Sequence, residues 1–157
     1  MTEQEKELLT KDLCARLPYY NGFTVEWKGD TYNIIGVGFG RVTLIKPFMS
    51  VTAGSPLVEE VRPYLRPMSD ISDDEVEEIR SRLNELNIGR VIDGHNFEKC
   101  CNILWFTRMF PNECVNHGMM SLVVDWLDAH NFDHRGLIDK GLAIKAPDGM
   151  YNISKTK

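Results

Sequence analysis

Six side chains between Val123 and Ile138 have the types and spacing needed for acid–base chemistry or metal binding. They are Asp125, Asp128, His130, Asp133, His134 and Arg135. His130 and His134 have the i,i+4 spacing of a metalloprotease helix, although the glutamate of that motif is absent. One interpretation of this stretch is therefore a hydrolytic or metal site that uses His130 and Asp133.

The same stretch also has the composition of a helix end. The polar residues that follow His130 indicate that the helix has stopped by Asp133. His130 would then interact with the helix dipole, and Phe132 would enter the core. Arg135 would pair with Asp128 or Asp133. The sequence leaves the two interpretations open.

The cysteines suggest a second place for chemistry. Cys114 and His117 have half of a zinc-site spacing, with Cys100 and Cys101 upstream. Zinc needs four ligands, and adjacent cysteines point to different sides of a helix or strand. Cys114 beside His117 could also act as a thiol nucleophile. Buried apolar cysteines are the simpler interpretation, so we assign no metal ligand, no cofactor and no catalytic residue.

The glycine-rich segment from Gly36 to Gly40 resembles a phosphate-binding loop only in composition. Such a loop must lead into a helix, whose first amides face the phosphate. A strand pattern follows here instead. We therefore expect a mobile hairpin connection and no nucleotide site.

The elements that position these residues follow from periodicity, capping and turn signals. We expect helices at 2–17, 72–86 and 119–130, and at 97–109 either a buried helix, which we favour, or a strand. We expect strands at 23–28, 31–37, 41–46, 57–61 and 141–145, with a turn at Gly29–Asp30, a loop at 50–56 and an extended connector at 62–67. These elements predict an α+β fold with an N-terminal helix, a small antiparallel, SH3-like sheet and a mostly helical C-terminal half. One domain spans 1–157, and sub-modules 1–69 and 70–157 are an alternative division.

Charge is distributed unevenly along the 157 residues. The net charge of −5 comes entirely from residues 70–87, because residues 1–69 and 88–157 each carry eight acids and eight bases. The absence of a basic block disfavours nucleic acid as a partner. The acidic segment, with Glu77 and Glu78, is either a solvated helix face or a docking face for a basic partner. A charged N-terminus and no apolar run of about 20 residues predict a cytoplasmic protein without a membrane segment.

Three phrases of the chain resemble a group of small uncharacterised proteins from gut Bacteroidales genomes and their prophages or mobile elements. The phrases are Leu13–Tyr19, Pro63–Ser69 and Asp125–Ala143. The group has no assigned activity, so the resemblance implies a setting and no catalytic residues. Its members often carry tyrosine at the position of His134, which argues against essential chemistry there. Residues 88–118 do not take part in the resemblance.

These observations favour a non-catalytic, cytoplasmic protein that binds another protein and comes from a mobile element. The residues expected to contact the partner are charged or aromatic: Tyr64, Arg66, Glu77, Glu78, Trp126, His130, Asp133 and Arg135. One alternative is a metal-dependent or thiol enzyme that uses Cys114 and His117, or His130 and Asp133. Another is an SH3-like module that binds nucleic acid through its aromatic residues. The sequence leaves the oligomeric state open.

Overall fold

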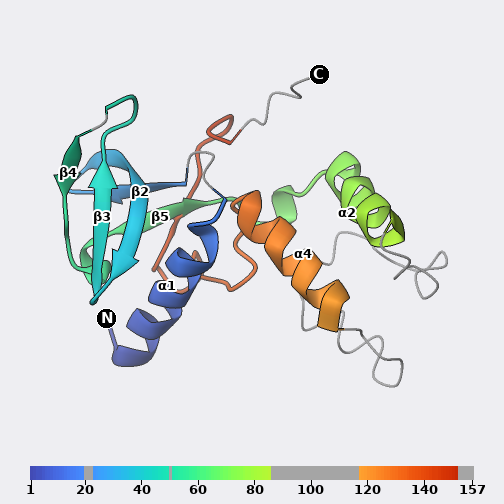
Figure 1. Ribbon diagram of the computed structural model, residues 1–157, viewed down its shortest axis with the longest axis horizontal. Helices are drawn as coiled ribbons and strands as arrows, with labels where there is room; N and C mark the ends of the chain where they lie inside the picture. Colours follow the sequence, from blue (N-terminus) through green and yellow to red (C-terminus); the bar gives the residue numbers. More distant parts are fainter. Residues whose placement is uncertain (20–22, 50, 86–116, 152–157) are drawn as a thin grey trace.

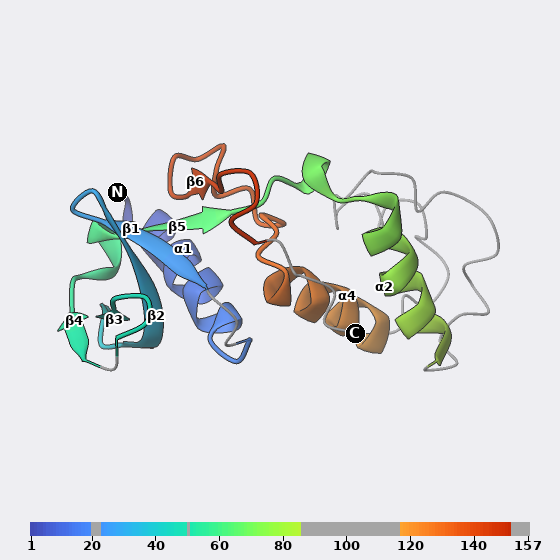
Figure 2. The ribbon, with the colours of Figure 1, turned by 90° about the horizontal axis from the view of Figure 1, so that it is seen from above.

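The structure, a computed structural model, describes residues 1–19, 23–49, 51–85 and 117–151. It has an α+β architecture in which a mixed, six-stranded sheet lies toward one end of the long axis and two helices lie toward the other (Figures 1 and 2). The helices are α1 (Glu3–Arg16), α2 (Asp73–Glu85) and α4 (His117–Ala129). The strands are β1 (Thr24–Trp27), β2 (Asp30–Gly38), β3 (Arg41–Ile45), β4 (Thr52–Gly54), β5 (Arg62–Leu65) and β6 (Ile144–Lys145), in the order β4-β3-β2-β1-β5-β6.

The helix starts follow the capping signals of the sequence. At α1, the Glu5 amide donates to the Thr2 hydroxyl over 3.2 Å, and the Thr2 amide donates to the Glu5 carboxylate over 2.7 Å. Ser72 and Glu75 form the same reciprocal pair at the start of α2. The predicted helices at 2–17, 72–86 and 119–130 are thus confirmed within the described residues, whereas the segment 97–109 lies outside them.

The predicted hairpin is confirmed, but its turn lies one residue earlier than expected. Trp27 pairs with Asp30, so the two turn residues are Lys28 and Gly29, with φ of 56° and 82°. A positive φ at both positions is the requirement of a type I′ hairpin turn. The next connection is equally tight, because β2 includes Gly36 and Gly38 and leaves only Phe39 and Gly40 for the turn. The expected hairpin connection is therefore confirmed, but it is shorter than the segment from Gly36 to Gly40.

Three predictions between residues 50 and 67 were also wrong. The expected loop contains β4, and the expected strand at 57–61 contains the 3-10 helix η1 (Val58–Glu60). The expected connector forms β5, which is antiparallel to β1 and parallel to β6. A proline normally argues against an interior strand because it cannot donate to the ladder. Pro63 nevertheless lies opposite Val25 within β5. A second 3-10 helix, η2 (Met68–Asp70), then leads to α2.

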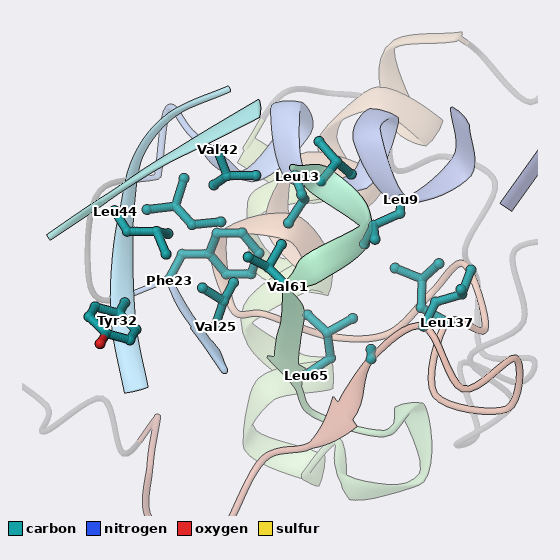
Figure 3. Close-up of a cluster of buried hydrophobic side chains, with 14 residues drawn as sticks. Leu9, Leu13, Phe23, Val25, Tyr32, Val42, Leu44, Val61, Leu65 and Leu137 are labelled. Carbon is teal, nitrogen blue, oxygen red and sulfur yellow. The ribbon is translucent and has the colours of Figure 1, made fainter. Parts of the chain in front are cut away.

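Two groups of buried apolar side chains hold these elements together. The first lies between α1, the concave face of the sheet and the segment after Gly136, and Figure 3 shows its leucines, valines and aromatic rings pointing toward one another. The second joins α2 to α4 through Val76, Ile79, Trp126 and Leu127, with Phe132 fully buried beside them. None of the helices in the described ranges combines the length and apolar character that crossing a membrane requires.

The sheet curls enough for Trp27 in β1 to reach β4. A Cβ added at Gly54 would lie 2.8 Å from Cη2 of Trp27, closer than carbon atoms approach. Gly54→Ala should therefore push the indole away and lower the free energy of unfolding by about 1–3 kcal/mol. Urea denaturation measures this loss. The control is Gly38→Ala, where an added Cβ meets nothing within 4 Å, and an equal loss there would show that Trp27 is not the cause.

Candidate partner-binding groove

An open groove of about 1050 Å³ lies between α2, the end of α4 and the turn after β6. Three of the residues expected to contact a partner, Arg66, Glu78 and His130, line it together. The other lining residues come from η2, α2 and the C-terminal turn: Asp70, Ser72, Asp74, Glu75, Arg82, Ala146, Pro147, Asp148, Gly149 and Tyr151. The groove thus unites segments that are far apart in the sequence.

Arg66 lines the groove and is held in place by hydrogen bonds of both its backbone and its side chain. Its amide donates to the Asn131 carbonyl and its carbonyl accepts from the Asp133 amide, both over 2.8 Å. The guanidinium donates to the two carboxylate oxygens of Glu75 over 2.7 and 3.1 Å, and it lies 4.1 Å from the ring centroid of Phe132. Arg66 therefore joins β5 to both helices of the groove.

The same arginine determines the charge of Glu75. Burial alone would raise the pKa of this carboxyl. The hydrogen bonds from Arg66, and then the bond from the backbone of Ser72, outweigh burial, so the pKa lies below its usual value. Glu75 is consequently ionised at neutral pH and paired.

The rings of Trp126 and His130 form a stacked pair at the end of α4 that lies next to α2. The two rings are 3.7 Å apart between centroids, and the Trp126 indole donates to Glu78 over 3.2 Å. Nδ1 of His130 lies 2.8 Å from the Trp126 carbonyl, which can only accept. In the neutral imidazole the proton is therefore on Nδ1, and Nε2 is an acceptor. Glu78 also accepts from Arg82 over 2.9 Å.

The groove carries an excess of negative charge. Its lining has five carboxylates, from Asp70, Asp74, Glu75, Glu78 and Asp148, against the guanidiniums of Arg66 and Arg82. Lys145 pairs with Asp70 at 3.2 Å and compensates one further charge at the rim. Both arginines of the lining already pair with carboxylates. The lining therefore has a net negative charge, which attracts cations and repels anionic ligands.

The remaining predicted contact residues lie outside the groove lining. Glu77 is exposed on α2, and Tyr64 lies in β5, where its carbonyl accepts from the Tyr151 hydroxyl over 2.9 Å. Asp133 accepts from the amides of Leu137 and Ile138 over 2.7 and 2.8 Å, which fixes the turn after α4. Asp133 thus has a structural task at the helix end.

Arg135 belongs to a buried charge network between α1 and the end of α4. Nη1 of Arg135 lies 2.8 Å from Asp12, 2.7 Å from Asp128 and 2.7 Å from Nε2 of His134. Arg16, buried in α1, donates to both carboxylate oxygens of Asp12 over 2.8 Å. The predicted pairing of Arg135 with Asp128 is confirmed.

This network has the donor types of a metal site but holds a cation of its own. Donor atoms of Asp12, Asp128 and His134 lie within 4.8 Å of one another. A guanidinium nitrogen of Arg135 lies 2.7 to 2.8 Å from an atom of each of the three residues, so a positive charge already lies among these donors. The two carboxylates of the donor set are therefore neutralised by two arginines, Arg135 and Arg16. The cysteines Cys100, Cys101 and Cys114 and the side chain of His117 lie outside the described residues.

Asp12 and Arg16 were missed by the sequence analysis, although a signal existed. Both lie on the same helix face as the buried Leu9 and Leu13. Two opposite charges at i,i+4 on an apolar face predict a buried ion pair.

Comparison of the chain with protein-family models, curated proteins and solved structures found no match.

Proposed function

We propose that this protein is a non-catalytic, cytoplasmic interaction protein that holds a basic segment of another protein in the acidic groove. The observation that carries the proposal is the groove of about 1050 Å³ in which five carboxylates face two arginines that are already paired. Lysine or arginine side chains of a peptide would complement the net negative charge of this lining. A bacterial mobile element is the proposed origin, and only the resemblance of the three sequence phrases supports it.

The test is a selection of random peptides on the purified protein, followed by binding of a selected fluorescent peptide measured by anisotropy. Selected peptides should be rich in lysine and arginine, and their affinity should fall as salt is added. The triple variant Asp74→Asn, Glu78→Gln, Asp148→Asn should bind about tenfold or more weakly. Glu78→Gln keeps an oxygen that can accept from the Trp126 indole, so the helix pair should stay intact.

The control variant removes three equally exposed carboxylates elsewhere, by Glu3→Gln, Glu7→Gln and Asp139→Asn. It changes the net charge by the same amount and should leave binding unchanged. Equal weakening by both triple variants would mean that total charge matters and the groove does not. Selected peptides without basic residues would contradict the proposal directly.

An SH3-like sheet that binds nucleic acid is a second candidate function. Lys28 lies 4.5 Å from the ring centroid of the half-buried Trp27, and the two together offer a cation beside an aromatic ring. The curl that brings Trp27 to Gly54 supports the SH3-like description. The zero net charge of residues 1–69 weighs against a phosphate backbone as the ligand.

A further inference from the structure

The chain between β3 and β4 exposes three large apolar side chains, two in the turn that follows β3 and one directly before β4. The exposed fractions are 108% for Phe48, 59% for Met49 and 74% for Val51. The Met49 amide donates to the Lys46 carbonyl over 3.1 Å, which closes a tight turn with Phe48 at its tip. We call these three residues the β4 apolar patch. Three exposed apolar side chains within four positions of the chain differ from the single, scattered apolar residues of ordinary protein surfaces.

Phe48 occupies a backbone conformation that suits glycine. Its φ of 65° lies in the left-handed region, which residues with bulky side chains rarely adopt. Glycine at this position would form the turn without steric strain. Phe39 shares the positive φ and the exposed ring, so Phe48 is set apart by its place beside Met49, Val51 and β4.

The patch lies next to an open edge of the sheet. β4 is the terminal strand of the sheet order, so one side of it has no neighbouring strand among the residues that the structure describes. The strand is Thr-Ala-Gly, and its three residues limit how long a paired edge can be, but it carries neither the lysine nor the proline that also protects such edges. Backbone groups on its outer side can pair with a short further strand.

Charge decides which occupant fits this edge. Residues 1–69 have no net charge, so this part of the molecule does not attract an anionic membrane or nucleic acid. The excess negative charge lies in and around α2, at the other end of the long axis (Figures 1 and 2). Two copies that meet at β4 would therefore keep their acidic segments far apart.

We propose that the β4 edge and the β4 apolar patch form a self-association surface for a second copy of this chain. Antiparallel pairing of β4 with β4 about a two-fold axis brings the same patch of each copy against the other, as an isologous interface requires. The three side chains and the strand edge of both copies would together bury roughly 1,000 Å², the lower limit of specific interfaces. The pair therefore exchanges with monomer, and the acidic groove stays open in both copies.

Sedimentation velocity of the full chain at concentrations from about 5 to about 500 µM tests the proposal by mass action. Wild type should shift from monomer to dimer without larger species. Phe48→Gly should weaken dimerisation about tenfold or more, because it removes the exposed ring and keeps the turn. Val51→Lys should weaken it similarly, because it places like charges across the two-fold axis.

Phe39→Gly is the matched control. Phe39 is also fully exposed and has a positive φ of 51°, but it lies at the opposite end of β3. Phe39→Gly should leave dimerisation unchanged, and melting curves at low concentration should show that both glycine variants fold. A wild type that stays monomeric at the highest concentration, or equal effects of the two glycine variants, would overturn the proposal. So would open-ended assembly, or Phe48-dependent binding of a monomer to phosphatidylserine vesicles.

Discussion

Arg16→Met should lower the free energy of unfolding by about 3–5 kcal/mol, the range for removing one partner of a buried ion pair. The Arg16 side chain has no exposed surface, and its guanidinium donates to Asp12 and to the Phe132 carbonyl. Methionine would fill much of the space and donate to neither group. The Asp12 carboxylate would then depend on Arg135 alone for its charge, and the carbonyl would lose its donor. Urea denaturation monitored by circular dichroism measures the loss.

The matched control is Arg82→Met. Arg82 forms the same i,i+4 pair with Glu78, but on an exposed surface, so its loss should cost less than about 1 kcal/mol. The double variant Asp12→Leu, Arg16→Met should recover part of the stability, because it leaves no unpaired carboxylate at Asp12. A loss below about 1 kcal/mol for Arg16→Met would mean that Arg135 alone compensates Asp12.

The wild type should also lose stability in acid through Asp128. Burial would raise the pKa of this carboxyl, but hydrogen bonds from His134 and Arg135 and the charge of Arg16 lower it from 3.8 to about 2. The unfolded chain therefore takes up the proton at a higher pH than the folded protein does. The stabilisation is complete above pH 3.8 and disappears as the pH falls toward 2. The loss should be about 1 kcal/mol at pH 3 and about 2 kcal/mol at pH 2.

The measurement is the difference in unfolding free energy between wild type and Asp128→Asn at several pH values from about 5 to about 2. Asparagine cannot titrate, so the difference should shrink as the pH falls. Asp139→Asn, at an exposed position, should stay within about 0.5 kcal/mol of wild type near neutral pH. A difference that is constant from pH 5 to 2 would show that the network does not hold the Asp128 proton affinity low.

Local signals were sufficient for the helix starts and for one hairpin. Thr2 with Glu5 and Ser72 with Glu75 needed only neighbours three residues away, so their caps could be predicted. The hairpin at Lys28 was likewise local, although its turn was placed one residue late. β5 was missed because Pro63 is a local signal against a strand. The segment is a strand because it pairs with β1 on one side and with β6 on the other.

The same contrast between local signals and tertiary contacts applies to the acidic groove and to the buried charge network. The sequence by itself identified Arg66, Glu78, His130 and Arg135 as chemically capable residues, because residue type and spacing are visible in one dimension. Only the tertiary structure decided that Arg66, Glu78 and His130 share a groove, while Arg135 turns inward to Asp12, more than a hundred residues earlier. Packing α1 against the end of α4 buries these charges, and buried charges must find partners wherever the fold supplies them. That requirement acts through space, so a sequence read along the chain does not contain it.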